Sequence, residues 1–133
     1  MEFEKQYLSY DEYQVLGGTL QETPFNILEL EARKNIDKYT FGRLKNLEEQ
    51  IDEVKICEFK LINLLDTYSN YENQNKAISS ENTDGYSVSY AQASENVSKA
   101  KLEEIRSTIK TYLAECYLEN GMPYLYSGVD RWL

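Results

Sequence analysis

Apolar side chains recur every three or four residues along three long stretches of the chain, which is the spacing of one face of an α-helix. The stretches cover about residues 23–39, 44–68 and 94–119, and a shorter helix is predicted over 10–16. The second long stretch carries an acid, Glu58, within its stripe. The stripe positions are Phe25, Leu28, Ala32, Ile36 and Tyr39, then Leu47, Ile51, Val54, Glu58, Leu61, Leu65 and Tyr68, then Val97, Leu102, Ile105, Ile109, Tyr112, Leu113 and Cys116.

Local signals mark the ends of these predicted helices. Ser9, followed by two acids, is a good N-cap for the short helix. Gly17-Gly18 stops that helix, because glycine adopts the left-handed conformation there without strain. Thr23-Pro24 is predicted to open the next helix with proline at its first position. Thr40-Phe41-Gly42 is predicted to break it.

A polar break at about 70–92 separates the last two long stretches. Within it, Asp84-Gly85 is a turn dipeptide, and the apolar residues that follow alternate with serines in a strand-like pattern. We therefore predict a protruding hairpin or extended loop from Lys76 to Ala91. The residues that would form its exposed part are Asp84, Gly85, Tyr86, Val88 and Tyr90.

The last fifteen residues, 119–133, are rich in apolar side chains but lack helical spacing. Asn120-Gly121 ends the last helix, and Pro123 prevents its continuation. Such a segment needs a surface to dock against. Its candidate docking residues are Tyr124, Leu125, Tyr126, Val129, Trp132 and Leu133. The pattern as a whole predicts one all-α domain over 1–133, a small bundle with a helical core at about 9–118.

The net charge of −9, from 23 acidic and 14 basic residues, narrows the function classes. Phosphate backbones and anionic membrane surfaces repel an acidic chain, so gripping nucleic acid or membrane is not expected. No apolar run reaches the roughly 18 residues that span a bilayer. The polar, acidic N-terminus is also unlike a secretory signal.

Residues suited to catalysis are scarce. Histidine is absent, which removes the commonest general base and metal ligand. The two cysteines, Cys57 and Cys116, lie in apolar helical stretches and are predicted to be reduced core residues. Acid pairs at 48–49, 52–53 and 103–104 fall on polar helix faces, which favours solvation over acid–base or metal chemistry. We therefore predict no catalytic, metal or cofactor site.

Twelve tyrosines are the unusual feature of the composition. Part of this set is expected at the edge of the core, but tyrosine and tryptophan are also enriched at protein–protein interfaces. Clusters near both ends and in the predicted hairpin therefore suggest contact surfaces. The N-terminal cluster, which is the candidate for contacts between subunits, consists of Tyr7, Tyr10 and Tyr13.

Several short motifs follow one another along nearly the whole chain. They are Tyr-Asp-Glu-Tyr at 10–13, Gly17-Gly18, a helix end at 36–40, Arg43-Leu44, a long helix over 51–65, DGYSVSY at 84–90 and YLYSGVD at 124–130. In this order they resemble the head-to-tail connector proteins of tailed bacteriophages, also called adaptor or head completion proteins. The chain departs from that family at Ser127, where a basic residue often precedes the closing Gly-Val.

The resemblance implies a structural virion protein located in the neck between head and tail and assembled in the bacterial host cytoplasm. About 12 copies would form a closed ring beneath the portal protein and extend the DNA channel toward a stopper or tail-completion protein. The C-terminal segment would dock on the portal, and the loop would face the channel or the next ring. Double-stranded DNA would pass through without specific binding, which suits an acidic protein.

Two other function classes remain open. A small acidic helical protein can be a chaperone or protein-interaction module, which usually dimerises through a broad apolar face, so native mass separates it from a ring-former. An enzyme using paired carboxylates is the third class, and a metal-dependent thermal shift would identify it.

Overall fold

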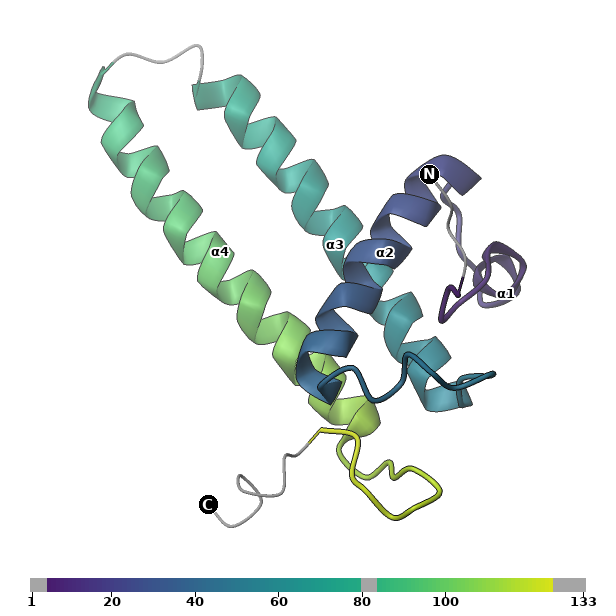
Figure 1. Cartoon of the computed structure of the whole chain (residues 1–133). Helices are drawn as coiled ribbons and strands as arrows, with labels where there is room; N and C mark the ends of the chain where they lie inside the picture. The colour runs from purple at the N-terminus through teal and green to yellow at the C-terminus, as the bar shows by residue number, and fades with distance from the viewer. Residues whose placement is uncertain (1–4, 80–83, 126–133) are drawn as a thin grey trace.

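The computed structural model describes residues 5–79 and 84–125 of the chain. These residues form four helices and no strand: α1 (Tyr10–Val15), α2 (Glu22–Thr40), α3 (Asp52–Ser79) and α4 (Asp84–Leu113). Helices α3 and α4 lie side by side as a long antiparallel hairpin (Figure 1). Helix α2 crosses them, and α1 lies on the side of α2 away from α4 (Figure 1). The prediction of a small all-α bundle is confirmed.

Helix α1 begins and ends where the local signals placed it. The Ser9 hydroxyl accepts the Glu12 N–H at 3.1 Å, and the Glu12 carboxylate accepts the Ser9 N–H at 3.0 Å. This reciprocal capping box satisfies two N–H groups that would otherwise have no partner. Gly17 is left-handed, with φ 100°. A Cβ on Gly18 would clash with the ring of Tyr13, so the second glycine is required for ring packing.

Helix α2 starts earlier than predicted. It begins at Glu22, with Gln21 as an N-cap that makes no side-chain hydrogen bond, so Pro24 is the third helical residue and Thr23 is not the cap. Proline is tolerated there because first-turn N–H groups have no intrahelical acceptor. The predicted break is confirmed: Phe41 is left-handed, with φ 58°.

The boundaries of the two long helices correct the sequence analysis. Helix α3 starts at Asp52 and not near Leu44, and it continues to Ser79. Helix α4 begins at Asp84 and ends at Leu113. The predicted loop residues are therefore helical, namely Asp84, Gly85, Tyr86, Val88 and Tyr90. Strand-like alternation covered only three apolar positions, whereas helix propagation continues without interruption into the strongly periodic stretch that follows. Residues 80–83 lie outside the described residues.

The core lies where α2, α3 and the second half of α4 meet. Its aliphatic residues come mainly from the predicted stripes, and aromatic side chains from both ends of the chain pack against them. Cys57 is buried, Cys116 is half-buried, and both are free thiols as predicted. The buried apolar residues are Tyr7, Leu8, Tyr13, Phe25, Ala32, Ile36, Leu44, Val54, Cys57, Leu61, Ile62, Leu65, Ile105, Ile109, Leu113 and Tyr124.

Candidate assembly surfaces

Most of the N-terminal tyrosine cluster belongs to the chain's own core. Tyr13 is 1% exposed, its ring centroid lies 4.8 Å from that of Phe25, and its hydroxyl accepts the N–H of Thr19 and Leu20. Tyr7 is also buried, whereas Tyr10 is half-buried. The prediction that this cluster contacts a neighbouring subunit is therefore wrong for Tyr7 and Tyr13, since neither side chain reaches the surface.

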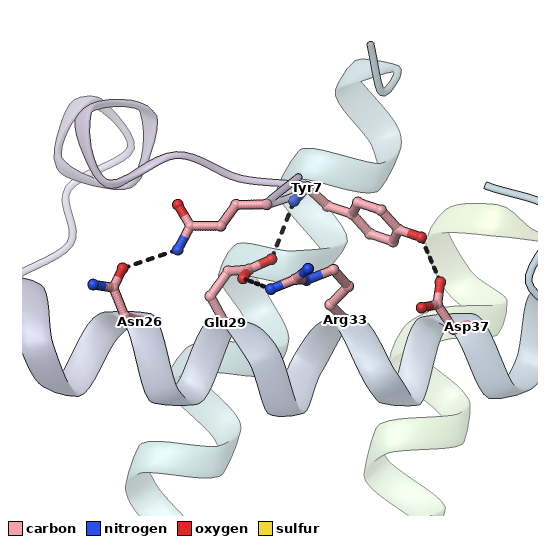
Figure 2. A network of polar contacts seen from close by, with 6 residues as sticks. Tyr7, Asn26, Glu29, Arg33 and Asp37 are labelled. Carbon is pink, nitrogen blue, oxygen red and sulfur yellow. Dashed lines mark hydrogen bonds and ion pairs between the residues drawn. The ribbon is translucent and has the colours of Figure 1, made fainter. Parts of the chain in front are cut away.

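Tyr7 is held in place by a row of charged side chains on α2 (Figure 2). Its backbone N–H donates to the Glu29 carboxylate at 3.1 Å, and its hydroxyl donates to the Asp37 carboxylate. Arg33 donates to the other Glu29 oxygen at 2.9 Å. Burial, followed by the Asp37 carboxylate, raises the pKa of the Tyr7 hydroxyl well above its usual value. This row fixes the segment before α1 across α2.

A second buried acid faces this row from α3. Both Glu29 and Glu58 are fully buried, and the two Glu58 carboxyl oxygens accept no hydrogen bond from any described residue. The Glu29 carboxyl is the polar neighbour of Glu58. Two ionised carboxylates would repel each other strongly in this setting, whereas a protonated Glu58 can donate a hydrogen bond to Glu29. We name these two residues the buried carboxyl pair.

The environment decides which member of the pair holds the proton. Burial raises the pKa of Glu58 well above its usual range, and the nearby Glu29 carboxylate raises it further. Burial also raises the pKa of Glu29, but Arg33 opposes that shift and the Tyr7 N–H stabilises the ionised form. The proton therefore resides on Glu58, and Glu29 carries the charge.

The C-terminal segment begins with a fixed root on the bundle. Tyr124 is 2% exposed, and its N–H donates to the carbonyl of Cys116 at 3.0 Å. An Arg43 N–H donates to the Pro123 carbonyl at 2.6 Å. Leu125 is half-buried against the core. Tyr124 is thus a core residue and not part of a free arm, which corrects its predicted role as a docking residue. The other candidates, Tyr126, Val129, Trp132 and Leu133, lie outside the described residues.

Among the hollows on the described surface, two are relevant to assembly. One, of about 550 Å³, is polar and lies beside the segment 45–50. The other, of about 480 Å³, is a groove in which side chains of α2, α3 and α4 meet. We call it the α2–α4 groove, and it is lined among others by Glu31, Lys34, Leu65, Lys101, Leu102 and Ile105. Among the described residues, no group of three or more acidic or Cys side chains could hold a metal ion.

The buried carboxyl pair was not predicted from the sequence, although the positions of the two acids in the helices indicate it. Glu58 occupies a position in the apolar stripe of α3, and a charged residue there must be buried or interrupt the stripe. Glu29 lies one turn after Phe25 and one turn before Ala32, both of which are fully buried. An acid at such positions on two helices that pack together predicts a buried pair.

Comparisons with known proteins return no match: no family description, no curated protein and no solved structure is significantly similar to this chain. Across 5–79 and 84–125, none of the helices has both the length and the apolar character needed to cross a lipid bilayer.

Proposed function

We propose that this protein is a structural adaptor of a bacteriophage head–tail connector. Copies of the chain assemble into a ring between portal and tail and extend the channel through which DNA passes. The protein acts by binding its neighbours and not by catalysis. The proposal is supported by the ordered motifs of the sequence, by the small all-α bundle and by the construction of the C-terminal root.

The root is the observation that carries this proposal. Backbone and side-chain hydrogen bonds hold Pro123 and Tyr124 on the bundle, and the nine residues that follow include Tyr126, Val129, Trp132 and Leu133. A fixed root limits the orientations of the segment after it, which reduces the entropy lost on binding. Tyrosine and tryptophan are also the residues that most often anchor interfaces. Residues 126–133 are therefore the docking arm, shorter than the range 119–133 predicted from sequence.

The acidic net charge of the chain is consistent with a ring that surrounds a DNA channel. The net charge of −9 repels phosphate, so DNA can pass an acidic ring without being held by it. Weak docking arms repeated around such a ring would also add up to firm attachment, because each bound arm raises the effective concentration of the next.

The test is a pair of truncations, assayed by co-purification with the portal protein encoded in the same genome. Deleting 126–133 should leave helical content and melting unchanged and abolish capture by the portal. Deleting 121–133 also removes Tyr124 from the core and should destabilise the fold by about 3–5 kcal/mol, the scale of losing a buried aromatic side chain.

A full-length Trp132→Ala variant is the matched control, since it changes one arm residue and should weaken capture without abolishing it. Unchanged capture by the chain lacking 126–133 would contradict the proposed docking arm. Electron microscopy of the co-purified complex should show a ring below the portal, and a discrete dimer without a ring would instead favour a chaperone.

A further inference from the structure

The α2–α4 groove combines an apolar floor with a basic rim. Leu65 and Ile105 are almost fully buried at its base, while Leu102 is 55% exposed at its edge. Two lysines and one acid, Lys34, Lys101 and Glu31, line the same groove. It is thus locally positive in a chain whose overall charge is −9.

One turn before Glu31, the exposed side chain of Ile27 extends this apolar character along α2. Ile27 is 51% exposed, and the spacing of 27, 31 and 34 places the three residues on one face of the helix. Exposed aliphatic side chains beside a groove forgo the free energy of burial, so a partner that covers them gains it.

The opposite composition occurs in the segment 47–56, which we call the acidic segment. It carries the acids at 48, 49, 52 and 53 together with three partly exposed aliphatic residues, Leu47, Ile51 and Ile56. The segment also contains Lys55, whose ammonium lies 2.5 Å from the Glu12 carboxylate and 3.7 Å from that of Glu49, yet the Glu49 side chain is still 84% exposed. In Figure 1 the loop after α2 starts beside the lower end of α4 and runs away from it to the first turn of α3. The groove and the acidic segment therefore occupy different sides of the molecule.

We propose that the acidic segment of one copy docks into the α2–α4 groove of the next copy, which makes the subunit contact of the ring head-to-tail. This inference rests on the proposed function and names the surfaces that would form the ring. Acids of one copy meet the lysines of the groove, and aliphatic side chains of both surfaces become buried together.

Charge and symmetry both favour this occupant. Two grooves facing each other would bring four lysines against two glutamates, and the excess of positive charge disfavours a two-fold dimer through the groove. A contact between two different surfaces of identical subunits repeats, and it closes into a ring when the rotation per subunit allows. The same contact between groove and acidic segment can join as many copies as the rotation per subunit permits, and it needs no further contact surface.

The experiment is a charge-swap rescue with the full-length chain. Lys34→Glu with Lys101→Glu reverses the groove, and Glu48→Lys with Glu49→Lys reverses the acidic segment. Each double variant alone should self-associate at least about tenfold more weakly than wild type, which is the scale of losing close charge pairs. An equimolar mixture of the two variants should recover association, because each reversed surface then meets a reversed partner. Sedimentation velocity at low salt up to millimolar protein measures this.

An apolar pair of variants provides the control. Leu102→Asp places a charge at the edge of the groove and should weaken association, whereas Val15→Asp changes a side chain that is 86% exposed on α1 and should not. Circular dichroism verifies that all variants keep the helical fold.

Three results would overturn the inference: a wild-type chain that stays monomeric throughout, double variants that associate like wild type, or a mixture that fails to recover. In each case capture by the portal through residues 126–133 would leave the proposed function standing. Loss of that capture with recovered charge-swap association would instead remove the portal role and retain the self-association surface.

Discussion

Helix α2 has two faces that use the same kinds of residues in opposite ways. On the inner face, Phe25 and Glu29 are fully buried. On the outer face, Ile27 is half exposed and Glu31 lies in the solvent-exposed rim of the groove. Glu29 and Glu31 are two positions apart, yet only the inner acid constrains its neighbours.

The difference shows that environment, and not residue type, determines what a charge does in this bundle. Removed from water, Glu29 needs Arg33 and the Tyr7 N–H to remain ionised, and it keeps Glu58 protonated. Glu31, by contrast, is exposed to water and lines the α2–α4 groove. The inner face therefore governs stability and its pH dependence, whereas the outer face carries the groove that we propose for association.

The largest expected effect separates the apolar residues of the two faces. Phe25→Ala should destabilise the protein by about 3–5 kcal/mol, because it leaves a cavity beside the rings of Tyr10 and Tyr13. Ile27→Ala should change stability by less than about 0.5 kcal/mol, as is usual for surface positions. Urea unfolding followed by circular dichroism measures both. Similar losses for the two variants would contradict the assignment of the faces.

The next effect concerns the buried carboxyl pair. Glu58→Gln keeps the size of the side chain, removes the proton that must be bound, and provides an amide N–H for Glu29. We expect it to stabilise the fold at pH 8 by about 1–3 kcal/mol and to have little effect near pH 4.5. Glu31→Gln on the outer face is the matched control, with no change expected at either pH. A destabilised Glu58→Gln protein at pH 8 would mean that the carboxyl has a partner as an anion.

The pH dependence of wild type should follow from the same pair. Because the pKa of Glu58 is raised in the folded state, the folded chain holds a proton that the unfolded chain has released. Stability is thus fully present below the unfolded pKa and falls as pH rises toward the folded pKa, by about 1.4 kcal/mol per pH unit for one proton. Denaturant titrations from pH 5 to 8 test this slope, which Glu58→Gln should flatten.

At lower pH, Glu12 contributes to the pH dependence of stability with the opposite sign. Burial alone would raise the pKa of Glu12, but hydrogen bonds from Lys55 and from the Ser9 backbone lower it. The stability due to this capping-box carboxylate is present above the unfolded pKa and is lost as pH falls through the folded pKa. The two contributions oppose each other: the one from Glu12 is lost at acid pH, and the one from Glu58 is lost as pH rises.

The smallest expected effect is on the outer face. Lys34→Glu should alter the free energy of unfolding by less than about 0.5 kcal/mol, since solvated surface charges contribute little. Thermal melting of the dilute monomer measures it. A large change would show that the groove lysine stabilises the subunit itself, and the association assays would then need a different variant.

Local signals predicted the parts of the fold that local interactions determine. Ser9, Glu12 and the glycine pair defined α1 because a cap and a left-handed stop act within a few residues. The start of α3 and the extent of the α3–α4 hairpin were misplaced, since neighbouring helices decide how far each one continues. The all-α class and most positions of the apolar stripes followed from periodicity and are confirmed by the packing. The stripe positions Leu47, Ile51 and Leu102 are exceptions, because each side chain is more than a third exposed.

The candidate sites were harder to predict because they depend on contacts between distant segments. Tyr7 and Tyr13 are residue types that occur both in cores and at interfaces, and only the position of α2 shows that they are buried. The buried carboxyl pair forms because α2 and α3 pack in a particular register, and the apolar stripe of one helix alone does not reveal that register. Tyr124 was assigned to a free arm because part of what holds its segment is distant in sequence: besides the Cys116 carbonyl, the segment is bonded by Arg43, eighty-one residues before Tyr124.

That long-range contact has a consequence for how the protein is made. Arg43 emerges from the ribosome eighty residues before its acceptor at Pro123. N-terminal regions can begin to fold during synthesis, yet this end of the core stays open until Pro123 and Tyr124 have also emerged. We expect a stalled nascent chain ending at Asn120 to be cleaved rapidly by proteases that spare the chain of residues 1–133. Chains that stop before Pro123 would then be degraded.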